Sequence, residues 1–178
     1  MLDPRKHPIL CLTLLLVVAT VMVWQAKPLY NWYQSKHALY LVGKSQSRLD
    51  EKDIQGAINA ANQAYRLSPE EPEVIRSLAK LYRMGGRGAK DALFLLNKLV
   101  GMNVATTEDR RDLAQILAHL GELPKAQAIA RELSNENPND PETIALQARL
   151  LIAEGDIAEG LNLLRRAQQI NPTSDGDH

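Results

Sequence analysis

The chain has very little cysteine and few aromatic residues. Its single cysteine, Cys11, cannot form an intrachain disulfide and cannot build a thiol-rich metal site. Aromatic residues make up only 4% of the sequence, whereas Ala and Leu recur along its whole length. This composition favours closely packed helices over a pleated sheet, so we expect an all-α protein.

The chain also lacks an excess of charge of either sign. Lys and Arg together number 21, and so do Asp and Glu, which gives a formal net charge of zero. Bulk electrostatic attraction to a polyanion is therefore absent. We do not expect nucleic acid as a partner.

Recognisable catalytic and metal-binding motifs are missing as well. The histidines have neither a second histidine nor a cysteine at metal-ligand spacing; they are His7, His37, His119 and His178. The run from Met84 to Lys90 reads MGGRGAK, but it lacks the spacing of a phosphate-binding loop and follows a predicted helix. We expect no enzymatic activity, no cofactor and no metal. A regulatory subunit or small enzyme with an unrecognised site is the alternative.

A long apolar run stands at the N-terminus. Residues Ile9 to Val23 read ILCLTLLLVVATVMV and carry no charge. A transmembrane helix needs about 17 to 20 such residues, and the following Trp24, Tyr30, Trp32 and Tyr33 suit a membrane interface. We predict a basic tail over residues 1–8, a transmembrane or signal-anchor helix over 9–26 and a juxtamembrane aromatic segment over 27–37. The alternative is a cleaved secretory signal, which would leave a soluble secreted or periplasmic protein.

Basic residues give a weak indication of membrane orientation. Arg5 and Lys6 precede the apolar run, while Lys27 and Lys36 follow it. Because basic residues tend to stay on the cytoplasmic side, the leading pair favours a cytoplasmic N-terminus. The rest of the chain would then lie outside the cytoplasm, on the periplasmic side, in a single-pass membrane protein.

The remaining sequence repeats with a period of 34 residues. Three kinds of landmark share this spacing: Ala114 with Ala148, Gly121 with Gly155, and Pro138 with Pro172. The small residues allow two helices to approach closely, the glycines can end a helix in the left-handed conformation, and the prolines cannot continue one. Each period therefore predicts a hairpin of two helices.

This pattern resembles the tetratricopeptide repeat (TPR) family. The resemblance covers residues 38–172 and implies a right-handed superhelical solenoid of about 3.5–4 units. The transmembrane helix predicted from the apolar run would precede this solenoid. The units would span about 38–71, 72–106, 107–140 and 141–174, followed by a polar tail over 173–178. Departures include Gly160, where the family has Ala, and Lys44, Ser45 and Arg48, which stand at positions that are apolar or small in the family.

The resemblance also implies a binding groove lined by the first helix of each unit. Carried over by position, its candidate partner-binding residues are Arg76, Lys80, Arg83, Arg111, Gln115, His119 and Arg149. Their positive charges outnumber the acidic residues at the inward positions, so we predict a basic groove floor that suits an acidic peptide or protein. Ordinary solvated charges on exposed helices are the alternative.

The last unit lacks the polar capping helix that usually closes a solenoid. Leu161, Leu164 and Ile170 are therefore a candidate docking patch, which could also form a homo-oligomer. Taken together, the sequence predicts a membrane-anchored scaffold or adaptor that binds a partner protein. Assembly or quality control of an envelope complex would suit such a protein.

Overall fold

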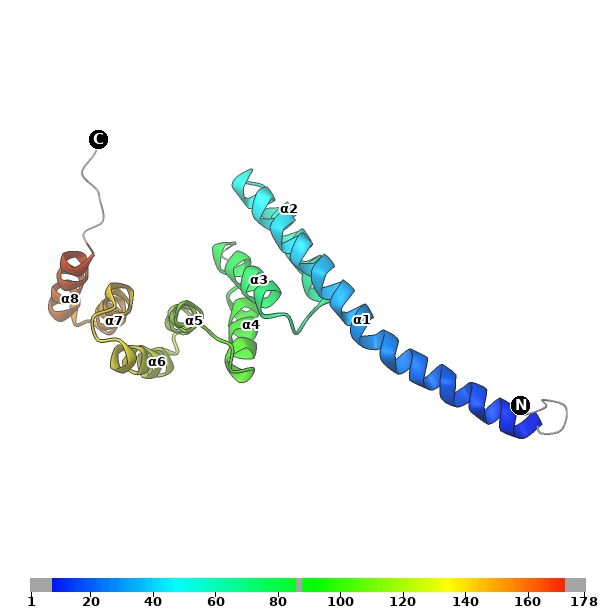
Figure 1. Cartoon of the computed structure of the whole chain (residues 1–178). Coiled ribbons are helices and arrows are strands. Elements are labelled where there is room, and N and C mark those ends of the chain that lie inside the picture. The colour runs from blue at the N-terminus through cyan, green and yellow to red at the C-terminus, as the bar shows by residue number, and fades with distance from the viewer. Residues whose placement is uncertain (1–7, 86–87, 172–178) are drawn as a thin grey trace. The chain divides into compact units, whose positions relative to one another are not determined.

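The computed structural model describes residues 8–85 and 88–171, with side chains from Lys27 onward. Within these residues the chain forms eight α-helices and no strand, which confirms the all-α prediction (Figure 1). The helices are α1 (Pro8–Asp50), α2 (Ile54–Leu67), α3 (Pro72–Met84), α4 (Ala89–Gly101), α5 (Thr107–His119), α6 (Leu123–Glu136), α7 (Pro141–Glu154) and α8 (Ile157–Ile170). They belong to two compact units, residues 1–74 and residues 75–178.

The first unit is a hairpin of α1 and α2, and α2 lies beside the C-terminal part of α1 (Figure 1). Its core joins Ala38 and Leu41 of α1 to Ala64 of α2 and to Val74. Asp53 begins α2, because its carboxylate accepts a hydrogen bond of 2.8 Å from the Gly56 backbone N–H. Arg48 of α1 donates to the same carboxylate at 2.8 Å, so one side chain connects both helices.

Helix α1 is continuous from Pro8 to Asp50 and therefore extends far beyond the hairpin. The structure describes the backbone of the predicted membrane segment 9–26 but not its side chains. The predicted polar tail 173–178 lies outside the described residues. Among the residues that could be searched, no helix is both long enough and apolar enough to cross a bilayer.

In the second unit, each helix from α4 to α8 packs against the next, and α5 also contacts α7. The small residues that mark the repeat lie in the buried seams. Ala114 and Ala148 are fully buried. Ala92 and Ala126, which stand 34 residues apart on the second helices α4 and α6, are fully buried too, and Ala79, the counterpart of Ala114 on α3, is only 3% exposed. Their burial agrees with the close helix approach that the 34-residue period predicts.

The turns between helices also follow the repeat pattern. Gly121 and Gly155 have φ angles of +82° and +99°, so each takes the left-handed conformation expected after a first helix. Pro69 and Pro138 lie in the turns that follow α2 and α6. Pro172, the counterpart of Pro138 in the last unit, lies outside the described residues, and so does Gly86, which precedes Gly121 by 35 residues.

Gly160, a departure from the family pattern, has a physical explanation. It is buried on α8, where the Cβ atom of a larger residue would lie 2.8 Å from the backbone oxygen of Ala148 and 2.6 Å from Cγ1 of Ile152. Even alanine is too large at this crossing of α7 and α8. The close approach of α8 to Ala148 and Ile152 of α7 thus explains why glycine stands at this position.

Candidate functional site

The seven predicted groove residues lie on three helices of the second unit. Arg76, Lys80 and Arg83 are on α3, the residues Arg111, Gln115 and His119 are on α5, and Arg149 is on α7. We call the surface formed by these residues the groove face. Three of its four arginines form ion pairs with a neighbouring helix or its N-cap.

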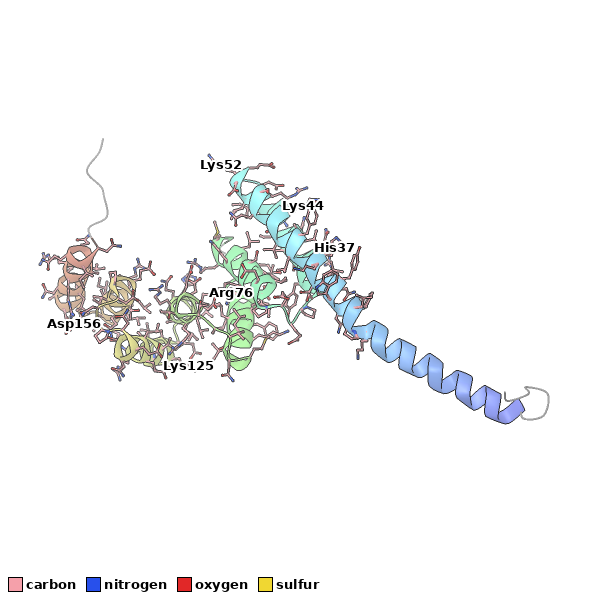
Figure 2. The ribbon with its side chains drawn as sticks, in the orientation of Figure 1. His37, Lys44, Lys52, Arg76, Lys125 and Asp156 are labelled. Atoms are coloured by element: carbon pink, nitrogen blue, oxygen red, sulfur yellow. The ribbon has the colours of Figure 1, made fainter. Side chains whose placement is uncertain are left out.

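Arg76, labelled in Figure 2, lies on α3. It is held by Asp109, a nearly buried residue in the first turn of α5. Its Nε lies 3.0 Å from each carboxylate oxygen, and its Nη2 lies 2.9 Å from Oδ2. The Asp109 side chain is only 4% exposed. Because the planar guanidinium matches a carboxylate in this forked geometry, Arg76 connects α3 to α5.

Asp109 also organises the start of α5. Its carboxylate accepts from the Thr106 backbone N–H at 2.8 Å, and its own N–H donates to Thr106 Oγ1 at 3.2 Å. These reciprocal bonds form a capping box. The carboxylate that binds Arg76 is therefore fixed by the helix terminus itself.

A similar ion pair recurs one repeat later, although its carboxylate belongs to the N-cap residue and not to the third residue of the helix. Nη1 of Arg111 lies 2.8 Å from Oδ2 of Asp140, the residue that caps α7, and Nη2 lies 2.5 Å from Oε2 of Glu142. Burial alone would raise the pKa of the Asp140 carboxyl, but hydrogen bonds from Thr143 and the charge of Arg111 together hold it below its usual value. In both repeats, an arginine of one first helix binds the carboxylate that begins the next.

Arg83 makes a third contact between α3 and α5. Its Nε lies 3.2 Å from Oδ2 of Asp112. Burial raises the pKa of the Asp112 carboxyl, and the nearby Glu108 and Asp109 charges add to this effect against the opposing charges of Arg83 and Arg111.

These contacts correct the predicted charge of the groove face. Asp109, Asp112 and Asp140 lie outside the inward positions of the family pattern, and they neutralise Arg76, Arg83 and Arg111. The predicted basic floor is thus largely offset by acidic residues of the neighbouring helix. Lys80 and Arg149 are exposed and have no ion-pair partner among the described residues.

A cavity of about 280 Å³ opens on the groove face between the second and third hairpins. Three of the predicted residues meet there, namely Arg83, Gln115 and His119, together with Ala89 and Ile116. The cavity combines a guanidinium, an amide and an imidazole with two apolar side chains. It can therefore receive an apolar side chain and hydrogen-bond to polar groups beside it.

The predicted docking patch lies on α8. Leu161 and Ile170 are 44% and 42% exposed, Leu164 is partly buried, and the neighbouring Ile157 is 57% exposed. Ile157 was not among the predicted residues, although its spacing of four residues from Leu161 places both side chains on one face of the helix. A second cavity, of about 330 Å³, opens among α6, α7 and α8 and is lined in part by Ala130, Leu150, Leu151 and Leu163.

Metal-binding chemistry has no visible basis in the part of the chain that the structure describes, where no cluster of His, Cys, Asp and Glu could hold an ion. His37 lies on α1 and His119 on α5. The other candidates weighed from the sequence, His7, His178 and the Cys11 side chain, lie outside the described residues.

No protein-family model matches this chain, and neither does any curated protein. Solved structures are similar, however. A tetratricopeptide repeat protein from Parabacteroides merdae ATCC 43184 has 22% identity and a TM-score of 0.62 over 79% of this chain, which spans 56% of that protein. TTC0263, a thermophilic TPR protein of Thermus thermophilus, has 16% identity and a TM-score of 0.65, with 76% of this chain and 75% of that one covered.

MamA from Desulfovibrio magneticus RS-1 is also similar, with 14% identity, a TM-score of 0.64 and 76% of each chain covered. At these low identities the similarity concerns the fold. It confirms the predicted TPR-like solenoid of helix hairpins, and it does not extend to a membrane-anchoring segment.

Proposed function

We propose that this TPR-like solenoid is a scaffold that binds a partner protein or peptide on the groove face. The observation that carries the proposal is the cavity where Arg83, Gln115 and His119 converge. TPR folds bind partners on the surface of their first helices, and this cavity lies on α3 and α5, with Ala89 of α4 at its edge. We propose no catalytic activity for it.

The lining of the cavity defines the kind of partner that fits. Ile116 and Ala89 supply apolar contact, while Gln115 and His119 can hydrogen-bond to a peptide backbone. Lys80 on α3 and Arg149 on α7 are exposed basic residues that would attract acidic residues of the partner. The proposed ligand is therefore an amphipathic segment with an apolar anchor, and acidic residues would contribute at its edges.

The proposed location is a membrane surface. The uncharged run Ile9–Val23 lies within the continuous helix α1, which also provides the first helix of the first hairpin. We propose that residues 9–26 anchor the chain, with the N-terminus in the cytoplasm and the repeats on the periplasmic side. There the scaffold would serve assembly or quality control of an envelope complex. The alternative is a soluble periplasmic or secreted adaptor, released by signal cleavage.

The exposed residues Leu161 and Ile170, with the partly buried Leu164, support a second proposal. They would form a docking or homo-oligomer patch on α8. Light scattering of the wild type and of Leu161→Glu would test it, since self-association through this patch should be lost in the variant.

A photo-crosslinking experiment tests the groove proposal. The full-length protein would carry p-benzoylphenylalanine at Gln115 in the cavity or, as a control, at the exposed Asn97 of α4. Crosslinking in intact cells, followed by membrane solubilisation and mass spectrometry, would identify the bound proteins and the N-terminus of the chain.

One dominant protein crosslinked at Gln115 and absent at Asn97 would support groove binding. Equal recovery from both positions would contradict it. An intact N-terminus in the membrane fraction would support anchoring, whereas a mature chain that begins beyond Val18 in the soluble fraction would support the cleaved adaptor.

A further inference from the structure

The part of α1 that follows the apolar run has an exposed apolar and aromatic surface. Leu29, Tyr30, Trp32 and Tyr33 are 68%, 60%, 58% and 63% exposed. A contiguous exposed surface of large apolar and aromatic side chains often marks a site that binds a partner or a membrane. We call this surface, with the exposed Lys27 and Lys36 that flank it, the collar.

The collar is also basic. From Lys27 to Leu49, α1 contains no Asp or Glu, and its charged residues are Lys27, Lys36, Lys44 and Arg48. Exposed Lys44 and His37 lie farther along the same helix, toward the turn at Lys52 (Figure 2). Lysines beside exposed Trp and Tyr are complementary to an anionic, partly apolar surface. A second copy of α1 would bring the same positive charges together, which disfavours a parallel pair.

The first hairpin begins at the C-terminal end of the collar. Ser35 Oγ donates to Glu71 Oε2 at 2.5 Å, so the turn between α2 and α3 lies beside Ser35. One helical turn later, Ala38 is already fully buried. Tertiary structure therefore begins where the collar ends. The acidic residues Glu70 and Glu71 of that turn would be repelled by phosphate groups and would resist deeper entry into an anionic layer.

We propose that the collar lies in the phospholipid headgroup layer and seats the first hairpin directly on the membrane surface. This inference rests on the proposed function, namely on residues 9–26 crossing the bilayer. An α-helix rises about 1.5 Å per residue, which puts Tyr33 about 10 Å beyond Ala26 along α1. A headgroup layer is about 5–7 Å thick on each side, and long Tyr and Trp side chains span the difference.

The geometry determines which end of the hairpin faces the lipid. Because α2 returns antiparallel to α1, the turn containing Glu70 is the end nearest the membrane. The opposite turn begins after Asp50, about 36 Å beyond Ala26 along the helix axis. The collar thus fixes both the height and the direction of the first hairpin without a flexible linker.

Tryptophan fluorescence of the full-length protein in vesicles tests the inference. The vesicles would contain phosphatidylcholine with phosphatidylglycerol as the minority lipid. Trp24→Phe leaves Trp32 as the only tryptophan, and Trp32→Phe leaves Trp24, which falls inside the predicted membrane segment. Brominated lipids would report depth in the bilayer, and iodide would report access from water.

We expect Trp32 to be quenched by lipids brominated near the headgroup end of the acyl chain. Iodide should quench Trp32 severalfold less in vesicles than in the protein unfolded in urea without detergent. If Trp24 is quenched by lipid while Trp32 stays open to iodide, the collar inference is overturned and the anchor stands. If neither tryptophan is quenched by lipid, the anchor fails as well.

A second measurement tests the direction of the hairpin. Nitroxide labels would be placed at Glu70→Cys or Lys52→Cys in a Cys11→Ser background, and relaxation by nickel-chelating lipids would be measured. The label at position 70 should relax severalfold more strongly than the label at position 52. Equal relaxation at the two positions would overturn the inference, and so would dipolar coupling between labels at Tyr40→Cys that shows a second copy on α1.

Discussion

Arg76 and Asp109 form a forked ion pair in which a largely buried carboxylate serves two helices at once. The guanidinium comes from α3, while the carboxylate also caps α5 through Thr106. Because removal of either side chain leaves the other without its charged partner, this pair holds the second and third hairpins together.

Replacement of Arg76 by alanine should therefore destabilise the protein substantially. The Asp109 carboxylate would stay in place at 4% exposure without its partner, which we expect to cost about 2–3 kcal/mol of unfolding free energy. Urea denaturation followed by circular dichroism would measure this. Lys80→Ala, one turn further along α3, is the matched control and should change stability by less than about 0.5 kcal/mol. Similar losses for both variants would show that the ion pair is not stabilising.

Asp112 and Asp140 should affect the pH dependence of stability with opposite signs. The folded-state pKa of Asp112 is raised, so the folded state binds more protons at this carboxyl than the unfolded state does. The contribution of Asp112 to the free energy of unfolding therefore falls as pH rises from below its unfolded pKa to above its folded pKa. The advantage of Asp112→Asn over the wild type should consequently grow from pH 3 to pH 7.

The folded-state pKa of Asp140 is lowered, so its contribution is fully present above the unfolded pKa of about 4 and disappears as pH falls through the folded value. Asp140→Asn should accordingly cost more stability at pH 7 than at pH 3. Urea midpoints of both variants across this range would check the signs, and parallel curves would contradict the assigned pKa directions.

Gly160→Ala should destabilise the last hairpin although alanine is the better helix former. Alanine would gain about 1 kcal/mol in helix propensity, but its Cβ would lie 2.8 Å from the Ala148 carbonyl oxygen, a backbone atom that cannot move freely. We expect a net loss of about 1–3 kcal/mol. Gly43→Ala in α1 has no atom within 4 Å of the new Cβ and should be neutral or stabilising. Thermal denaturation of the two variants would separate propensity from steric clash.

Gly155→Ala should also be destabilising, but for a different reason. Gly155 has open space around it and a φ of +99°, a conformation that strains an L-residue by about 1–2 kcal/mol. Asparagine tolerates the left-handed region better, so Gly155→Asn should lose less stability than Gly155→Ala. Equal losses in chemical denaturation would show that backbone strain does not set the requirement for glycine.

The repeat pattern was readable from the sequence because it depends on size and backbone conformation. Ala114 and Ala148 are buried, and Gly121 and Gly155 have positive φ, since a tight helix hairpin admits few alternatives at these positions. The continuity of α1 from residue 8 to residue 50 was harder to predict from the sequence, because the first hairpin departs from the family pattern. Ser45 is 1% exposed there, while Lys44 points into solvent.

The neutralisation of the groove arginines could not be predicted from inward positions alone. Asp109 and Asp140 occupy capping positions, where their local role is sufficient to explain them. Their second role, the ion pair with an arginine of the preceding repeat, depends on how one hairpin stacks on the next. The positions within a single repeat carry no information on this stacking. The motif Thr106-x-x-Asp109 was a usable signal for a helix start and for a fixed carboxylate.

The carboxylates that begin α5 and α7 also act as built-in competitors. Asp109 and Asp140 are tethered beside Arg76 and Arg111, so their effective concentration at those guanidinium groups exceeds that of most free ligands. An incoming acidic peptide must displace an intramolecular ligand and loosen a contact between repeats before it can use either arginine. If the groove face binds a partner as proposed, we therefore expect Arg76 and Arg111 to contribute little to the attraction of acidic groups, because Asp109 and Asp140 already bind them.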